Sequence, residues 1–422
     1  MLPEQVSMLV AGGGPAGFMA AISAAEAGVE GVHLLEATGD TLHKVLISGG
    51  GRCNVTHACW DPRDLVAHYP RGSRALRGPF SRFAAGDTVA WFDSHGLELV
   101  EEGDGRLFPR ANRASAVAAC LRRAAAAAGV TVHAGQALQA AAREGQGFGL
   151  SLRHGRRLHA RRLVLATGSH PSGRRLATGF GHTIVPPVPS LFTLALAADP
   201  LLALAGVCMD PVTLTLELPG GGRHQQRGAV LITHWGLSGP ASLRLTAFAA
   251  RQLQASSYRA TLRIDWSGGQ SPEVIERLFD QCRRDQARRL LANWRPWPGL
   301  SSRLWQHLLE RSGVEPGRRW ADLGKVQQQR LVGDLCGSRH AISGRGPFGE
   351  EFVTAGGVDL GEVNLARMES RLVPGLHLVG ELLDVDGVTG GFNFQHCWSS
   401  GWLAGQALAA DSTAPEPSSG QT

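Results

Sequence analysis

The hydrophobic pattern near the N-terminus is typical of a strand, a helix and a second strand. An apolar run at residues 8–11 leads into a glycine turn, and an alanine-rich stretch with helical character covers residues 18–27. Gly28 then ends the helix, and residues 32–36 form another apolar run. This order predicts a βαβ unit.

Helix and strand patterns continue in the same style until a group of prolines. Residues 115–128 have helical spacing and precede a strand at 130–133. Residues 147–152 and 157–165 read as an antiparallel pair, whose apolar strand stops at Thr167 and Gly168. After the prolines at 186–189 the pattern becomes β-like, in the segments 191–196, 212–218, 229–233 and 260–266. We therefore expect a domain boundary at these prolines.

Residues 272–335 have helical spacing and many arginines, whereas glycine-rich strands return after Arg339 and a helix is expected at 394–410. The pattern predicts an α/β nucleotide-binding domain that is discontinuous in sequence. Its expected parts are residues 1–187 and 353–411, with a β-rich domain at 188–267 and 336–352 and a helical insertion at 268–335. Residues 412–422 are rich in Ser, Pro and Gly, and we expect a disordered tail there.

The turn between the first strand and the first helix has the spacing of a dinucleotide-binding fingerprint, Gly12-x-Gly14-x-x-Gly17. Gly12 permits a tight turn, Gly14 lets the backbone approach a pyrophosphate, and Gly17 allows the helix to pack closely on the strand. Pro15 and Ala16 complete the turn. The helix N-terminus then presents N–H groups and a positive dipole end to the phosphates.

Glu36 lies 19 residues after Gly17, where its carboxylate can accept hydrogen bonds from both ribose hydroxyls. FAD and NAD both bind in this way, so the C-terminal part decides between them. A strand there ends at Gly380 and Glu381, and a second carboxylate at a strand end can bind the ribityl hydroxyls that only FAD has. The helix that follows would direct its N-terminal dipole at the flavin and stabilise the reduced ring. We therefore predict FAD as the cofactor.

A third segment, residues 44–54, contains three consecutive glycines followed by Arg52, Cys53 and Asn54. Its amides can line up on a phosphate or a flavin edge, with Arg52 as an anion partner. A flexible surface turn fits the same residue types equally well.

Composition narrows the class of protein. Hydrophobic residues make up 43% and charged residues 18%, as in a folded soluble protein. No apolar run of about 18 residues is uninterrupted and the N-terminus has no basic leader, so we expect neither a membrane span nor a signal peptide. The net charge of +6 suits an anionic partner, but the arginines are spread along the chain, and nucleic acid is not the expected partner. Seven scattered cysteines indicate a reducing cytoplasm.

Together these segments resemble the bacterial NAD(P)/FAD-dependent oxidoreductases labelled aminoacetone oxidase-like or BaiN-like. The resemblance extends from end to end, over residues 11–17, 46–56 (LISGGGRCNVT), 233–240 (THWGLSGP), 353–360 (VTAGGVDL) and 376–402. It implies a doubly wound FAD-binding domain of the glutathione-reductase type. It also implies that a β-rich domain, itself carrying a helical subdomain, interrupts this domain.

By residue match, the resemblance implies a FAD site that draws on both ends of the chain, and we expect no metal site. The ADP half is expected to contact Gly12, Gly14, Pro15, Ala16, Gly17 and Glu36. The rest of the cofactor is expected to contact Lys44, Gly50, Gly51, Arg52, Cys53, Asn54, Thr167, Gly168, Gly380, Glu381, Asp386, Gly390, Gly391, Phe392 and Asn393.

The predicted function is hydride transfer between flavin N5 and a small organic substrate or NAD(P)H, with the substrate unidentified. No second GxGxxG is present, so NAD(P)H would be a diffusible reductant. His234 and His396 are the candidate acid–base residues, and a lone histidine is more often structural. A redox dithiol of Cys53 and Cys59 is disfavoured, because five residues separate them where disulfide reductases of this fold have four.

Two other classes of protein fit the sequence less closely. The basic balance and the arginine-rich block at 283–319 would suit an RNA-modifying flavoprotein. The same fold could also bind FAD without turnover.

Overall fold

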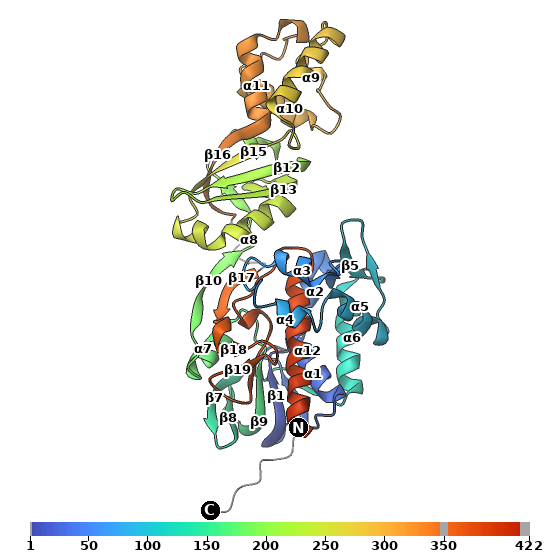
Figure 1. Cartoon of the computed structure of the whole chain (residues 1–422), viewed down its shortest axis with the longest axis vertical. Helices are drawn as coiled ribbons and strands as arrows, with labels where there is room; N and C mark the ends of the chain where they lie inside the picture. The colour runs from blue at the N-terminus through green and yellow to red at the C-terminus, as the bar shows by residue number, and fades with distance from the viewer. Residues whose placement is uncertain (1, 347–352, 414–422) are drawn as a thin grey trace, which may run out of the picture. The chain divides into compact units, whose positions relative to one another are not determined.

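The computed structural model describes residues 2–346 and 353–413. The chain forms two compact units, of which the first comprises Met1–Pro187 with Thr354–Thr422 and the second Val188–Val353 (Figure 1). None of the helices in the described residues is long and apolar enough to span a membrane.

A sheet with a parallel centre forms the core of the first unit. The central strands pair in the order β20-β9-β1-β2-β6. All four residues of β2 are buried, as expected where helices cover both faces of a parallel sheet. These strands are β1 (Gln5–Ala11), β2 (Val32–Leu35), β6 (Thr131–His133), β9 (Arg157–Leu165) and β20 (Leu376–Leu378).

Antiparallel strands extend this sheet beyond β9 only, since the opposite edge is β6. β7 and β8 form a meander with β9, and β18 and β19 continue from β20. Their bounds are β7 (Leu138–Glu144), β8 (Gly147–Leu152), β18 (Val363–Asn364) and β19 (Glu369–Ser370). The expected antiparallel pair at 147–152 and 157–165 is therefore β8 and β9.

Helices α1 (Pro15–Glu26) and α12 (Phe392–Thr413) pack side by side in the first unit (Figure 1). A Cβ atom on Gly401 of α12 would lie 2.5 Å from the Ala16 carbonyl oxygen, so the two backbones are in close contact. α12 continues beyond the expected end of the helix to Thr413 and takes up the first two residues of the expected tail. The rest of that tail, 414–422, lies outside the described residues.

The sequence analysis predicted no helix or strand between residues 43 and 112. In the structure this segment folds into many short elements. None is longer than ten residues, which explains the lack of a periodic signal. They are α2 (His43–Ile47), η1 (Ser48–Gly51), β3 (Thr56–His57), α3 (Pro62–Leu65), η2 (Val66–His68), α4 (Arg77–Phe80), α5 (Ala85–Ser94), β4 (Leu99–Glu101) and β5 (Arg106–Pro109). Longer helices follow at α6 (Ala114–Ala127) and α7 (Pro171–Gly179).

The prolines at 186–189, where a domain boundary was expected, lie inside a strand, β10 (Ile184–Ser190). β10 pairs with β17 (Val353–Val358) in a sheet of two strands. Each strand of such a ribbon has an edge without ladder bonds, where proline is tolerated. The chain passes from one unit to the other within these two strands.

The second unit is a closed barrel with a helical insertion. Its strands pair in the order β11-β14-β13-β12-β15-β16. They are β11 (Leu194–Leu196), β12 (Cys208–Glu217), β13 (Arg223–Ile232), β14 (Gly236–Ser238), β15 (Ala260–Asp265) and β16 (Ser338–Arg345), with α8 (Pro240–Ala255) against β13. Three helices lie between β15 and β16, namely α9 (Pro272–Asp285), α10 (Ser302–Arg311) and α11 (Lys325–Gly337).

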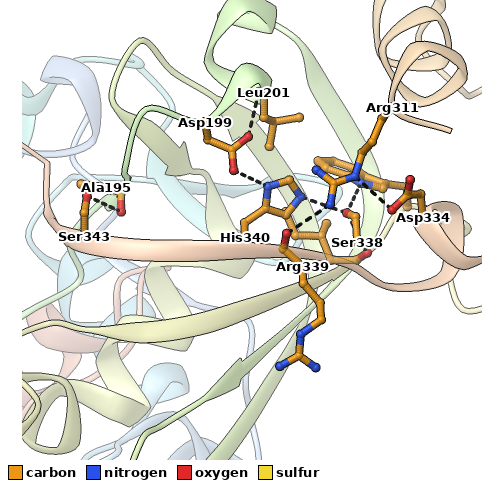
Figure 2. Close-up of polar contacts among 11 residues, drawn as sticks. Ala195, Asp199, Leu201, Arg311, Asp334, Ser338, Arg339, His340 and Ser343 are labelled. Carbon is orange, nitrogen blue, oxygen red and sulfur yellow. Dashed lines mark hydrogen bonds and ion pairs between the residues drawn. The ribbon is translucent and has the colours of Figure 1, made fainter. Parts of the chain in front are cut away.

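The barrel and its insertion share one core and one set of polar contacts. Leu262 of β15 belongs to the same buried cluster as Phe279 and Trp305 of the insertion. Arg311 of α10 bonds Asp334 of α11 at 3.0 Å and donates to the carbonyl of Arg339 in β16 (Figure 2). The predicted fold class, a doubly wound α/β domain with a β-rich part that carries helices, is confirmed.

Candidate cofactor site

The glycine turn between β1 and α1 has one crowded side and one open side. A Cβ atom on Gly12 would lie 2.3 Å from the Ala166 carbonyl oxygen, and one on Gly17 would lie 2.0 Å from the Gly12 carbonyl oxygen. Gly14, which precedes the Pro15 that opens α1, has no atom within 4 Å of its Cβ position. The open side is therefore at Gly14 and the helix N-terminus, where phosphates bind.

Glu36 is fixed beside this turn by hydrogen bonds to both of its oxygens. Oε2 accepts from the backbone N–H of Gly13 at 3.0 Å. Oε1 accepts from the backbone N–H of Thr38 at 2.8 Å and from its hydroxyl at 2.9 Å. The carboxylate thus lies where the fingerprint places a ribose acceptor.

An open pocket of about 500 Å³ lies beside the residues that follow Glu36. Its volume is in the range of small-molecule sites, and its mainly apolar walls suit a planar base. The sequence analysis missed these residues because they come from several separate segments. The lining comprises Phe18, Gly39, Asp40, Thr41, Arg122, Ala126, Val130, Val132 and Ala134.

The segment of residues 44–51 contacts the C-terminal part of the first unit. Gly50 and Gly51 have φ angles of 67° and 82°, and neither has an atom within 4 Å of its Cβ position. Lys44, at the start of this segment, donates from Nζ to Glu381 Oε2 at 2.6 Å and to Ser169 Oγ at 3.3 Å. Residues 337 positions apart are therefore in direct contact.

Arg52 is held by neighbouring side chains of the first unit. Its Nε donates to Asn112 Oδ1 at 2.6 Å, and its guanidinium pairs with Glu102. The guanidinium carbon also lies 4.0 Å from the centroid of the Phe108 ring. These partners, which the sequence did not reveal, already satisfy the charge that was expected to bind an anion.

The two cysteines near this loop are free thiols. Cys53 is fully buried with a φ of 59°, and burial raises the pKa of its thiol to about 12. Burial also raises the pKa of Cys59. Burial thus favours the protonated thiol of both cysteines at neutral pH, which disfavours a redox dithiol. The side-chain oxygen of Asn54 is buried 2.8 Å from the Cβ position of Gly391.

The end of β9 contacts the C-terminal strand end. Gly168 has a φ of 61°, and its Cβ position lies 3.7 Å from Glu381 Oε2. The hydroxyl of Thr167 is buried, with a Cβ position on Gly173 only 1.7 Å away. Gly380, which precedes Glu381, donates its backbone N–H to Ser400 Oγ at 3.0 Å.

The loop from Asp384 to Phe392, here named the glycine loop, is fixed by polar contacts with Arg71 and with Asn393 in the first turn of α12. Asp386 is fully buried, and Arg71 donates to both of its oxygens. Asn393 Oδ1 accepts from the Gly387 backbone N–H at 2.8 Å, and its Nδ2 donates to the Gly387 carbonyl at 2.9 Å. Asp386 and Asn393 therefore hold the shape of the loop.

Phe392 begins α12 as part of a stack of rings. Its centroid lies 4.9 Å from that of His57 and 4.1 Å from that of His68, with interplanar angles of 19° and 11°. Gly390 and Gly391 precede it with φ angles of 121° and 91°, which favour glycine. A Cβ atom on Gly391 would also lie 2.7 Å from the backbone of Thr56, so β3 and the glycine loop are in close contact.

The two candidate histidines differ in their surroundings. His396 is only 2% exposed, and its Nε2 bonds the Gly380 carbonyl at 3.2 Å. Burial lowers the pKa of His396 to about 4, so the ring is neutral at pH 7 and has no protonated form to act as an acid. His234 belongs to the second unit, where it is exposed in the turn between β13 and β14.

An Asp–His–Ser chain in the second unit has the hydrogen-bond order of a hydrolase triad. His340 bonds Asp199 Oδ2 from Nδ1 at 2.7 Å and Ser338 Oγ from Nε2 at 3.0 Å (Figure 2). Ser338, however, is 2% exposed, and its oxygen also accepts from Trp266 Nε1 at 3.1 Å. A nucleophile must reach its substrate, so this chain is a buried structural network.

One group of three potential metal ligands, Glu369, His377 and Asp411, occurs among the described residues. Arg367 bonds Glu369 Oε2 at 3.0 Å and Asp411 Oδ2 at 2.5 Å. The guanidinium thus already supplies the positive charge that a metal ion would bring to these carboxylates.

The residues of the first unit fit FAD in charge and shape. Two open glycine segments, at Gly14 and at Gly50 to Gly51, can approach phosphates without side chains in between. Glu36 follows β2 directly, whereas Glu381, expected at a strand end, lies in a short 3-10 helix (Gly380–Leu382) just after β20; both carboxylates can accept from sugar hydroxyls. The N-terminus of the 22-residue helix α12 follows the glycine loop.

Comparison with known proteins finds a matching family profile and full-length relatives. A profile of the HI0933-like protein Rossmann domain matches residues 6–407. The 3-dehydro-bile acid delta(4,6)-reductase of Clostridium scindens is 30% identical over 416 residues, which cover 95% of this chain and 98% of the reductase. The ribosomal RNA dihydrouridine synthase of Escherichia coli is 30% identical over 428 residues, which cover 96% of this chain and 99% of that enzyme.

A solved structure shows the same fold at low sequence identity. The 3-ketosteroid delta1-dehydrogenase of Sterolibacterium denitrificans has a TM-score of 0.54 at 14% identity, covering 97% of this chain and 100% of that one. The profile and the full-length relatives establish the family. The chain belongs to the HI0933-like family of Rossmann-domain proteins, the flavin-dependent oxidoreductases that its motifs resemble.

Proposed function

We propose that this enzyme binds FAD in its first unit and transfers a hydride between flavin N5 and either NAD(P)H or a small organic substrate. The contact between Lys44 and Glu381 carries the proposal. It joins the segment of residues 44–51 to the C-terminal part of the first unit, so that segments distant in sequence can hold one extended cofactor.

Each segment has a distinct role in the proposed complex. Gly14 and the N-terminus of α1 would bind the pyrophosphate, and Glu36 would accept from the adenosine ribose. The pocket beside residues 39–41 is of a size to hold the adenine. Lys44 orients Glu381, which would accept from the ribityl hydroxyls.

The substrate class is inferred from the names of two full-length relatives. A delta(4,6)-reductase of 3-dehydro bile acids saturates carbon–carbon double bonds next to a ketone. A dihydrouridine synthase saturates the double bond of a uracil ring. We infer that the substrate here contains a carbon–carbon double bond conjugated to a carbonyl group.

The proposed reduction adds one hydride and one proton to the double bond of the substrate. Held by these residues, FAD would supply hydride transfer at N5, with NAD(P)H as the hydride donor and the β-carbon of the substrate as the acceptor. A proton from water or from a protein group is then required at the α-carbon. His396 is neutral and bonded to the Gly380 carbonyl, so it is not that donor.

The test begins with the visible spectrum of the purified protein. We expect bound flavin, reduced without oxygen by NADH or NADPH and reoxidised by a 3-keto-4,6-diene steroid or a uridine oligonucleotide. A colourless protein that does not take up FAD would overturn the proposal. Bound flavin that neither probe reoxidises would overturn only the substrate class.

An RNA substrate is the second candidate, because of the charge of the helical insertion. Residues 268–335 contain twelve Arg and Lys against eight Asp and Glu, which gives most of the chain's net positive charge. Arg289 stacks on Trp294 at 4.5 Å, a combination that also binds bases. If RNA is the substrate, we expect the protein to bind RNA with an affinity that falls steeply as salt rises. A protein that does not bind RNA even at low salt would exclude an RNA substrate.

A further inference from the structure

Residues 68–72, which begin at the last residue of η2, contact the glycine loop along its length. The backbone N–H of Val388 donates to the His68 carbonyl at 2.9 Å. Tyr69 Oη donates to the Phe392 carbonyl at 2.6 Å. A Cβ atom on Gly72 would lie 2.8 Å from Val385 Cγ2. This segment, here named the brace, therefore lies against the loop at several points.

The strongest contact of the brace is the ion pair of Arg71 and Asp386. Arg71 donates to both carboxylate oxygens, and the two residues also form an isolated antiparallel bridge. The side chain of Asp386 is 0% exposed and that of Arg71 is 12% exposed. A carboxylate buried to this extent is strongly destabilising without its partner.

Tyr69 ties the brace to the first turn of α12. Its ring is buried, and it packs against Phe80 and edge-on against Phe392. Burial raises the pKa of Tyr69, so its hydroxyl remains a donor to the Phe392 carbonyl. The start of α12 therefore has a fixed position relative to the brace.

We propose that Arg71 and Tyr69 are positioning residues, which hold the glycine loop and the start of α12 in the geometry that binds the flavin. The proposal rests on the FAD site proposed above. Gly387, Gly390 and Gly391 give the loop high conformational freedom, and ordering it costs entropy. The brace supplies that order before the cofactor arrives, which raises affinity.

The experiment compares Arg71→Met, Arg71→Lys and Tyr69→Phe with the wild-type protein. Amide hydrogen exchange of residues 384–392 is measured without FAD, and the FAD dissociation constant and the flavin reduction potential are measured with it. Asp199→Asn is the matched control, because Asp199 makes a buried pair with His340 in the other unit.

We expect faster exchange of the glycine loop in Arg71→Met, and an FAD dissociation constant raised about tenfold if only a tenth of the molecules keep the competent loop. Arg71→Lys should restore part of the affinity, and Tyr69→Phe should lower the reduction potential, because α12 would stabilise the reduced ring less. Asp199→Asn should lower stability while FAD affinity stays unchanged.

The two proposals fail in different ways. Wild-type protein that binds no FAD refutes the cofactor proposal, and the exchange data then still test the brace. Unchanged exchange and affinity in both Arg71→Met and Tyr69→Phe overturn the brace. An equal loss of affinity in Asp199→Asn also overturns it, because the effect would then be general destabilisation. If Arg71→Met does not fold, Tyr69→Phe and Arg71→Lys carry the test.

Discussion

The three fingerprint glycines differ in what surrounds their Cβ positions, so substitution can separate cofactor binding from folding. Gly14→Ala should leave the unfolding free energy within about 0.5 kcal/mol of wild type, because its Cβ position is open and its φ is −87°. It should weaken FAD binding, since the methyl group occupies the space proposed for the pyrophosphate. Urea unfolding of the apo protein and FAD titration measure the two effects.

Gly17→Ala is the control for that substitution. Its Cβ atom would lie 2.0 Å from the Gly12 carbonyl oxygen, so we expect a loss of about 1–3 kcal/mol in the apo protein. If Gly14→Ala binds FAD as tightly as wild type, the pyrophosphate does not lie at this turn.

His396 makes stability depend on pH. Its folded pKa of about 4 is below the unfolded value of about 6.5, so the unfolded state binds more protons between these values. The stability from the neutral buried ring is complete above about pH 6.5 and falls as pH drops towards 4. Between pH 7 and pH 5 the loss is about 2 kcal/mol.

His396→Gln keeps a donor for the Gly380 carbonyl and removes the titration. Urea unfolding of the apo protein at pH 7 and pH 5 should therefore show a smaller difference in the variant than in wild type. An identical difference in both proteins would mean that folding does not lower the pKa of His396.

For single residues, the sequence predicted the sites of close backbone approach better than the partners of charged groups. The roles expected for Gly12 and Gly17 follow from local spacing, and their crowded Cβ positions agree with them. The partners of Arg52 and Asp386 lie 50 and 315 positions away, and nothing local indicates them. The contacts of the proposed FAD site remain predictions that the variants above test.

Among the elements, α12 depends on a glycine for its packing against α1. A Cβ atom on Gly401 would lie 2.5 Å from the Ala16 carbonyl oxygen and 2.8 Å from Met19 Cβ, both in α1. Gly401→Ala should therefore lower the unfolding free energy by about 1–3 kcal/mol. Thermal or urea unfolding measures this loss.

Gly333 in α11 offers the matched control, because nothing lies within 4 Å of its Cβ position. Gly333→Ala should raise stability by about 0.5–1 kcal/mol, as alanine favours a helix over glycine. The two helical glycines should thus respond with opposite sign. A stabilising Gly401→Ala would contradict the close packing of α1 and α12.

Long elements with a clear period were predicted well, and short ones were not. The pattern at 115–128 corresponds to α6, within one residue at each end. The short elements between residues 43 and 112 are stabilised by contacts with distant segments, as the brace is by the glycine loop. The strand β10 was missed because prolines disfavour strands except at free edges.

Across the whole molecule, the second unit has a core of its own. Its buried cluster runs from Phe192 to Ile342 and includes both the barrel and the insertion. Residues 188–346 expressed alone should therefore fold, with cooperative urea unfolding followed by tryptophan fluorescence. They should bind no FAD, because the proposed site lies in the first unit.

The contrasting outcome for this fragment would be a non-cooperative transition with exposed apolar surface. The core would then need the first unit, against the division of the chain into two compact units. The fold class was predictable at this scale because the glycine fingerprint and the return of glycine-rich strands near the C-terminus are both visible in the sequence.

The pairing of β9 with β20 determines when, during synthesis, the sheet of the first unit can be completed. β9 ends at Leu165, but its partner β20 starts only at Leu376, after the whole second unit has been synthesised. Until then residues 163–165 of β9 lack this partner, although β8 can already pair with residues 157–160, and Lys44 has no Glu381 to bind. The barrel can fold as soon as it emerges. The proposed FAD site is therefore complete only near the end of translation, and we expect a chain truncated before α12 to retain no flavin.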